Sequence, residues 1–253
     1  MPEFYDPIAY DAATEGVPGD VDFFMELAKE ADTAGQPVLE LACGTGRVAI
    51  PIAREGVRVV GLDLNTGMLN RAREKSADLA NISWVEGDMR SFALEERFGL
   101  VYIPFRSFQH MLTVEDQLSC LRCIRDHLTP GGRLALDIFN PDIVAIAQWM
   151  TVKRGGLQRR GRTVEHAGKW ETSAYRTASQ QVETTFIDDK LSDEGAVMSR
   201  IYRDLKLRYT FRYEMEHLLL RSGFQIEALF GDCLRSEFQD LSPEMIWVAR
   251  SPN

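Results

Sequence analysis

The sequence lacks any long apolar run. No stretch of its 253 residues approaches the roughly 20 consecutive apolar residues that a helix needs to cross a bilayer. The first residues, MPEFYDPIAYD, are acidic and lack the apolar core of a secretory signal. We therefore expect no membrane partner and a cytoplasmic location.

Cysteine and basic charge are also scarce. Four cysteines in a chain of this length do not suggest a disulfide framework. Cys120, Cys123 and His127 share one predicted helix, but the sequence has no second pair at zinc spacing, so we expect no metal site. The net charge of −9 disfavours a polyphosphate partner, and we expect no nucleic acid.

Short apolar runs alternate with segments of helical periodicity over the first two-thirds of the chain. This alternation predicts parallel strand–helix–strand units, and hence an α/β fold with a doubly wound, mostly parallel sheet. The same pattern resumes after residue 210. Strands are predicted at 38–42, 58–63, 82–86, 98–103, 133–139, 224–230 and 244–250, and helices at 19–33, 46–55, 66–80, 114–128 and 212–222.

Residues 151–209 have a different pattern, in which apolar and polar residues alternate with a period of two. QQVETTFIDDKL, the turn SDEG and the segment after it predict an antiparallel hairpin. We expect a β-rich insertion here, between an α/β core at 1–150 and its return at 210–253. KRGGLQRRGR, at 153–162, holds five positive charges and no acid; it is either a solvated loop or a guide for an anionic substrate.

The stretch VLELACGTGR, at 38–47, joins a predicted buried strand to a glycine turn and a helix. Its glycines fit the loose pattern of a nucleotide-binding turn, and Asp63 follows Gly44 by 19 residues, at the end of the next strand. Beside a pyrophosphate, the carboxylate of Glu40 would repel the ligand. A carboxylate here instead suits a ligand with positive charge, such as a sulfonium that also carries an ammonium group.

VLELACGTGR resembles the first motif of the class I S-adenosylmethionine-dependent methyltransferases, V-L-[DE]-x-[GA]-C-G-T-G. GLDLN (61–65), EGDM (86–89) and PGGRLALDIF (130–139) fall at the spacings of later motifs of this family. The resemblance implies a Rossmann-like methyltransferase sheet with S-adenosylmethionine (SAM) as cofactor. It implies that Asp63 binds the ribose hydroxyls and Asp88 the adenine amino group. The cofactor-binding residues that it implies are Tyr5, Glu40, Ala42, Cys43, Gly44, Gly46, Asp63, Leu64, Met68, Asp88, Met89 and Phe105.

The acceptor should bind near the end of the fourth strand, because open α/β sheets place ligands at the carboxyl ends of their strands. IPFRSFQHML, at 103–112, lacks the [DN]-P-P-[YF] tetrapeptide and the Pro-Cys pair of nucleobase methyltransferases, which disfavours nucleobase methylation. His110 is the candidate base, and Arg106 is the candidate partner of a substrate carboxylate or phosphate. Each has a structural alternative: packing for His110, and a surface pair with Glu115 or Asp116 for Arg106.

FYDPIAYD, near the N-terminus, is similar to small-molecule members of the superfamily, whose leading helix covers the cofactor. In them a tyrosine reaches toward the methyl group. Tyr5 and Tyr10 are the candidates here, and Tyr10 joins Arg106 and His110 as the predicted catalytic residues. Each tyrosine could equally cover the edge of the core.

The β-rich insertion is similar in organisation to that of the deoxyaminosugar N,N-dimethyltransferases. In those enzymes the insertion roofs the acceptor pocket and contributes to a dimer interface. The resemblance implies a small-molecule acceptor, methylated at nitrogen or oxygen, and it permits a homodimer. Two alternatives stay open: a protein or peptide methyltransferase, and a catalytically silent SAM-binding subunit.

Overall fold

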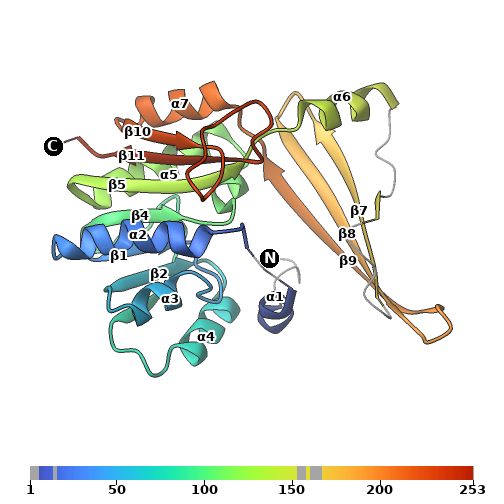
Figure 1. Cartoon of the computed structure of the whole chain (residues 1–253), viewed down its shortest axis with the longest axis horizontal. Coiled ribbons are helices and arrows are strands. Elements are labelled where there is room, and N and C mark those ends of the chain that lie inside the picture. The colour runs from blue at the N-terminus through green and yellow to red at the C-terminus, as the bar shows by residue number, and fades with distance from the viewer. Residues whose placement is uncertain (1–5, 14–15, 153–157, 160–166, 253) are drawn as a thin grey trace. The chain divides into compact units, whose positions relative to one another are not determined.

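The computed structural model describes residues 6–13, 16–152, 158–159 and 167–252. The chain forms two compact units, which Figure 1 shows as ribbons. The α/β unit comprises the described residues of 5–140 and 210–253, and the insertion unit those of 141–209. Tyr5 lies outside the described residues, as does most of the basic stretch 153–162.

Among the described residues, the α/β unit contains one seven-stranded sheet, in the order β10-β11-β5-β4-β1-β2-β3 (Figure 1). Strands β1 to β5 pair in parallel, whereas β11 runs antiparallel to both β5 and β10. This is the doubly wound, mostly parallel sheet that the alternation predicts. The strands are β1 Val38–Leu41, β2 Val59–Asp63, β3 Ile82–Glu86, β4 Phe98–Ile103, β5 Leu128–Phe139, β10 Gln225–Phe230 and β11 Glu244–Arg250.

Two apolar cores lie on the two faces of this sheet. Val101 and Ile103 belong to one core, and Leu100 and Tyr102 belong to the other. Successive side chains of a strand point to opposite faces, so β4 is buried on both sides. The helices of this unit are α1 Pro7–Ala13, α2 Asp20–Thr33, α3 Ala49–Arg54, α4 Thr66–Lys75, η2 Ser107–His110, α5 Val114–His127 and α7 Arg212–Arg221.

Helix α3 begins three residues later than predicted, at Ala49 instead of 46. Gly46 has a φ of 78°, in the left-handed region, so it cannot belong to a right-handed helix. Pro51 therefore lies in the first turn of α3, where a backbone N–H has no acceptor within the helix. Helix α4 also ends earlier than predicted, at Lys75, where the Ser76 hydroxyl donates to the carbonyl of Ala72 at 2.8 Å.

The sequence pattern did not predict three further features. Helix α6 (Ile143–Val152) lies in the insertion unit, and the single turn η2 follows β4. Strand β5 begins at Leu128, so Pro130–Gly132 lies within it instead of preceding it. Proline and glycine are poor strand formers, and these residues lie at an irregularity of the β4–β5 register, between the Phe98–Leu128 and Leu100–Arg133 pairs.

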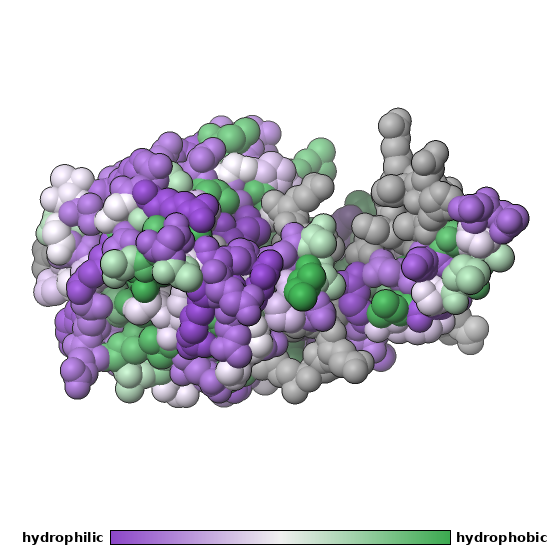
Figure 2. All heavy atoms as spheres, turned by 90° about the horizontal axis from the view of Figure 1, so that it is seen from below, coloured by the Kyte–Doolittle hydropathy of each residue, from purple (hydrophilic) through white to green (hydrophobic). Residues whose placement is uncertain are grey.

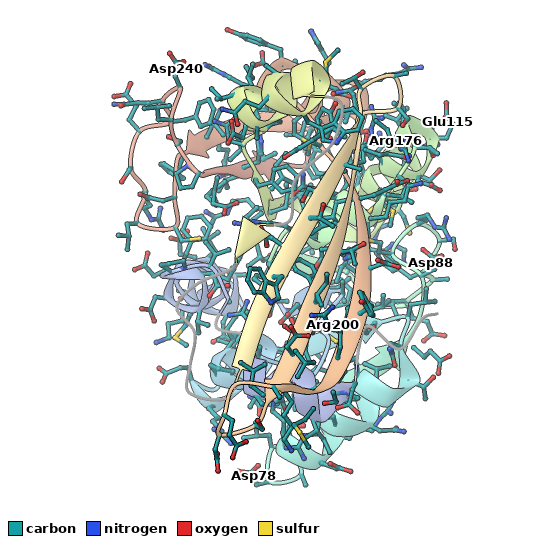
Figure 3. All side chains as sticks on the ribbon, turned by 90° about the vertical axis from the view of Figure 1, so that its right-hand side faces the viewer. Asp78, Asp88, Glu115, Arg176, Arg200 and Asp240 are labelled. Carbon is teal, nitrogen blue, oxygen red and sulfur yellow. The ribbon has the colours of Figure 1, made fainter. Side chains whose placement is uncertain are left out.

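As far as it is described, the insertion unit contains an antiparallel sheet in the order β6-β7-β8-β9. Strands β8 and β9 form the predicted hairpin, and the Ser192 N–H donates to the Ala196 carbonyl at 2.8 Å in its turn. Arg200, labelled in Figure 3, donates to both carboxylate oxygens of Asp189 across the hairpin at 2.6 and 2.8 Å. The strands are β6 Gln158–Arg159, β7 Ala167–Arg176, β8 Gln181–Leu191 and β9 Val197–Arg208.

The helices of the described part are all too short or too polar to cross a membrane. In Figure 2, hydrophilic residues cover much of the coloured surface, and apolar residues are interspersed among them.

Thr113→Ala should lower the free energy of unfolding by about 1 kcal/mol, because it removes the cap of α5. The Thr113 hydroxyl accepts from the Asp116 N–H at 3.1 Å. Thr33→Ala is the control: its exposed hydroxyl donates to the Lys29 carbonyl at the end of α2, and its loss should cost less than about 0.5 kcal/mol. Urea unfolding followed by circular dichroism measures both, and equal losses would contradict the cap.

Candidate functional site

Parallel strands bring the predicted site residues to one edge of the sheet. The glycine turn follows β1, and Asp63, Asp88 and η2 come at or after the ends of β2, β3 and β4. These strands are neighbours and parallel, so their carboxyl ends meet at the same edge. Residues from four separate motifs therefore share one region.

Asp63 holds the glycine turn in place. Its carboxylate accepts the Gly44 N–H at 2.8 Å and the Asn65 N–H at 2.8 Å. Ala42, Gly44 and Gly46 all have positive φ, so the turn is a left-handed path that glycine adopts most readily. Burial raises the pKa of Asp63 above its ordinary value, and these backbone N–H groups oppose the rise. A carboxylate has lone pairs beyond the two used here, so Asp63 can still accept from a hydroxyl.

Glu40 is buried behind this turn, at 2% exposure. It lies opposite Tyr102 in the pairing of β1 with β4, and the Tyr102 hydroxyl donates to its carboxylate at 3.0 Å. Burial raises the pKa of Glu40 to about 8, although Tyr102 and the charge of Arg47 oppose the rise. Without a ligand, Glu40 is therefore mostly protonated at neutral pH. A cation bound nearby would favour its ionised form.

Arg47, a residue that the sequence analysis did not single out, joins the glycine turn to the first residue of α2. Its guanidinium donates to both carboxylate oxygens of Asp20 at 3.0 and 2.5 Å, and lies 5.3 Å from the ring centroid of Phe105. Tyr10 also belongs to this group: a Cβ on Gly44 would lie 4.0 Å from its ring. Burial raises the pKa of the Tyr10 phenol, and Arg47 and Glu40 are among the charges that act on it.

The other residues predicted to bind the cofactor are in differing environments. Asp88, labelled in Figure 3, accepts from Arg90, which also donates to Asp116 at 2.9 Å. The Arg90 guanidinium holds the pKa of Asp88 below its ordinary value, so Asp88 is a carboxylate at neutral pH. Met68 is buried, and Met89 packs against the core. Leu64 is 47% exposed, next to Asp63.

Cys43 is buried in the glycine turn. Burial raises the pKa of its thiol well above the ordinary value, and the nearby carboxylate of Glu40 adds to the effect. The thiolate is the nucleophilic form of cysteine, and it is disfavoured here. Cys43 therefore serves as a small apolar residue of the turn.

The backbone after β4 is strained. Phe105 and Arg106 are consecutive residues with φ of 57° and 61°, a region that non-glycine residues rarely adopt. The carboxylate of Asp137 in β5 accepts both of their N–H groups, at 2.7 and 2.8 Å. Asp137 is fully buried, and burial raises its pKa to about 7. These two hydrogen bonds hold the left-handed turn against its conformational cost.

The side chain of Arg106 pairs with Glu244 in β11, not with Glu115 or Asp116. Its Nε donates to both carboxylate oxygens of Glu244, at 3.1 and 3.2 Å, and its Nη2 donates to one of them. Glu244 is buried, whereas the Arg106 side chain is 41% exposed. The role of Arg106 toward a substrate stays a prediction.

His110 is the last residue of η2. Burial lowers its pKa below the ordinary value, so its imidazole is neutral at pH 7 and can accept a proton. The preceding residue, Gln109, is fully buried, and its side-chain oxygen accepts the Phe139 N–H at 3.1 Å. This contact joins η2 to the end of β5, and the catalytic role of His110 stays a prediction.

Sequence reasoning missed Asp137 and Glu244, although one signal was available. LALDIF places an acid inside an apolar strand, as VLEL does for Glu40. A buried carboxylate needs hydrogen-bond donors, so such a residue indicates a nearby polar contact. No comparable signal marks Glu244, which begins β11 and meets Arg106 only through the folding of the chain.

Helix α5 carries Cys120, Cys123 and His127. The side chains of Cys123 and His127 form hydrogen bonds with backbone groups. The Cys123 thiol donates to the Phe92 carbonyl at 3.2 Å. His127 Nε2 accepts the Leu94 N–H at 3.1 Å, and its Nδ1 lies 2.8 Å from the Cys123 carbonyl oxygen. In the part of the chain that the structure describes, no group of three or more His, Cys, Asp or Glu residues could hold a metal ion.

Comparison with known proteins identifies relatives of the chain. Residues 38–132 match the methyltransferase domain family. The chain is 27% identical over 208 residues to the dTDP-3-amino-3,4,6-trideoxy-alpha-D-glucopyranose N,N-dimethyltransferase of Streptomyces venezuelae. This alignment covers 81% of this chain and 82% of that protein. It is 30% identical over 143 residues to the cypemycin N-terminal methyltransferase of a Streptomyces species, over 55% of this chain and 58% of the relative. The match therefore spans little more than half of the cypemycin enzyme.

Solved structures share the fold over nearly the whole chain. The CcbJ methyltransferase from Streptomyces caelestis is 27% identical, with a TM-score of 0.82, over 98% of this chain and 96% of that one. An S-adenosylmethionine-dependent methyltransferase from Clostridium acetobutylicum has a TM-score of 0.78 at 16% identity, over 98% of this chain and 96% of that one. At this low identity, the second likeness concerns the fold alone.

Glu40→Gln should stabilise the protein more at pH 8.5 than at pH 5. The folded state raises the pKa of Glu40 from 4.5 to about 8, so unfolding releases a proton between these values and stability falls as the pH rises. The amide has no such titration. We expect the variant to gain at least about 1 kcal/mol relative to the natural protein between the two pH values.

Thermal or urea unfolding of both proteins in the absence of ligand measures this difference. Glu55→Gln is the control, because the hydrogen bond from Lys29 lowers the pKa of this exposed acid instead of raising it. A Glu40→Gln effect that does not change with pH would show that Glu40 is ionised in the folded protein.

Proposed function

The chain belongs to the class I S-adenosylmethionine-dependent methyltransferases, and we propose that it transfers the methyl group of SAM to an amine nitrogen of a small-molecule acceptor. SAM supplies an electrophilic methyl group on a sulfonium. The enzyme's task is to align a lone pair with that methyl group and to exclude water.

The observation that carries the cofactor assignment is the pair of carboxylates around the glycine turn, of which Glu40 is buried and Asp63 partly buried. Asp63 accepts the Gly44 N–H, and Glu40 lies behind the same turn with its pKa raised to about 8. A positive methionine end would favour the ionised form of Glu40, and ribose hydroxyls would donate to Asp63. A pyrophosphate brings no positive charge and would not favour the ionised form of Glu40.

On the acceptor side, an amine must lose a proton as its nitrogen forms the new bond to carbon. We assign the proton to His110, whose lowered pKa keeps its imidazole neutral and able to accept it. Arg106 would bind an anionic group of the acceptor with the part of its side chain that is exposed. Tyr10 lies against the glycine turn and would contact the cofactor near the methyl group.

The relatives support nitrogen as the acceptor atom. The N,N-dimethyltransferase aligns over 208 residues, more than the α/β unit contains, so the likeness extends into the insertion unit. The substrate in the name of that enzyme is an amino sugar on a nucleoside diphosphate, which has both an amine and an anionic group. We therefore propose an amino sugar nucleotide as the first substrate class. We further propose that residues 151–209 cover the acceptor and that the chain forms a homodimer.

A peptide amine is the second candidate. The cypemycin relative, named as an N-terminal methyltransferase, favours it. The two candidates share a primary amine and differ in the anionic diphosphate, so one experiment separates them.

Asp63→Ala should weaken the binding of SAM at least tenfold, because it removes the acceptor of the ribose hydroxyls and one anchor of the turn. Calorimetric titration of the natural protein with SAM and, separately, with NADH comes first. Asp78→Ala, which removes an exposed acid in the loop after α4, should leave the affinity unchanged. Micromolar binding of NADH without binding of SAM would overturn the cofactor assignment.

Arg106→Lys should raise the Michaelis constant for the acceptor about tenfold or more and spare the affinity for SAM, because lysine cannot form the same bidentate contact. Transfer of labelled methyl groups to amino sugar nucleotides and to short peptides measures it. Arg58→Lys, at an exposed pair with Glu96, is the control. Methylation of peptides alone would favour the second candidate, and an unchanged Michaelis constant would remove Arg106 from the acceptor site.

A further inference from the structure

Asp11 in α1 makes contacts to two other elements of the α/β unit. Its carboxylate accepts from the Thr45 hydroxyl of the glycine turn at 2.6 Å. It also accepts from Lys75 at 2.8 Å and from Arg71 at 3.0 Å, both in α4. Lys75 donates in addition to Thr45 at 3.3 Å, so the three elements are joined by one network.

Helix α1 needs such contacts in order to stay in place. It has seven residues, and isolated helices shorter than about 12 residues are marginal in water. Its position on the α/β unit must therefore come from tertiary contacts. Asp11 is only partly buried, and so are its partners, with side-chain exposures of 21% for Asp11, 36% for Arg71 and 30% for Lys75. Single exposed ion pairs contribute little, but several charges that share one acceptor form a network.

The residue next to Asp11 is Tyr10, the predicted catalytic tyrosine. Tyr10 lies against Gly44, and Thr45, the partner of Asp11, follows Gly44 in the turn. Tyr10, Asp11, Arg47, Arg71 and Lys75 together line a cavity of about 340 Å³. The contacts of Asp11 thus join α1 to the glycine turn and to α4 at the residue next to Tyr10.

We propose that Asp11 is a positioning residue that latches α1 over the cofactor site, by joining this helix to Thr45 of the glycine turn and to Arg71 and Lys75 of α4. One consequence of the latch, slower dissociation of SAM, rests on the proposed function. The contacts of the latch itself need no ligand. Release of the latch frees α1 and with it Tyr10. Burial raises the pKa of Asp11, but the hydrogen bonds from Lys75, Thr45 and Arg71 outweigh burial and hold this pKa below its ordinary value. The carboxylate of Asp11 is therefore ionised at neutral pH.

Asp11→Ala tests the latch, because alanine removes the carboxylate and favours the helix itself. We expect the backbone amides of α1 to exchange with deuterium at least tenfold faster in the variant, in the absence of any ligand. Glu74→Ala is the matched control: it removes another carboxylate that accepts from Arg71, at 3.1 Å, within α4. Exchange in α1 should be unchanged in this control.

A second measurement follows the release of SAM by stopped flow. Asp11→Ala should increase the dissociation rate at least tenfold, whereas Glu74→Ala should leave it unchanged. The latch would be overturned if the amides of α1 exchanged no faster in Asp11→Ala than in the natural protein. It would also be overturned if they exchanged faster in both variants. Faster exchange in Asp11→Ala alone, in a protein that binds no SAM, would support the latch and contradict the proposed function.

Discussion

The site depends on one physical arrangement: a carboxylate at or near the end of a strand, buried or partly buried, accepts backbone N–H groups of a turn. Asp63 does this for the glycine turn, and Asp137 does it for the strained turn at Phe105 and Arg106. In both cases the turn follows the neighbouring strand of the sheet. Left-handed backbone costs free energy, and charged or polar acceptors within the sheet compensate that cost.

Burying acids has its own cost. Desolvation raises the pKa of Glu40 and Asp137 to about 8 and 7, and it raises that of Asp63 as well. Such groups contribute little to the stability of the fold, since each loses hydration that its few donors replace only in part. They suit a site whose ligand brings positive charge and hydroxyl donors. The electrostatics of these acids are therefore consistent with the methyl donor of the family.

Arginine and lysine side chains around the site form ion pairs with acids. Arg47 pairs with Asp20, Arg106 pairs with Glu244, and Arg71 and Lys75 pair with Asp11. Each pair joins segments that are distant in the sequence: the start of α2, the last strand, and the leading helix. The segments around the sheet edge are thus held by ion pairs, whereas the sheet itself is held by its two apolar cores.

The sequence alone predicted the sheet, the order of its helices and strands, the hairpin of the insertion and the family, because these depend on local periodicity and on contiguous motifs. The structure confirmed the sheet and the hairpin, moved the starts of α3 and β5 and the end of α4, and added α6 and η2. Gly44 and Asp63 were predicted together because one motif contains the spacing. The contacts of Arg106 with Glu244 and of Asp11 with Lys75 were not predictable, because they join residues 138 and 64 positions apart. Only the folded chain brings such side chains within hydrogen-bond distance, so the tertiary structure decided which charges face one another around the site.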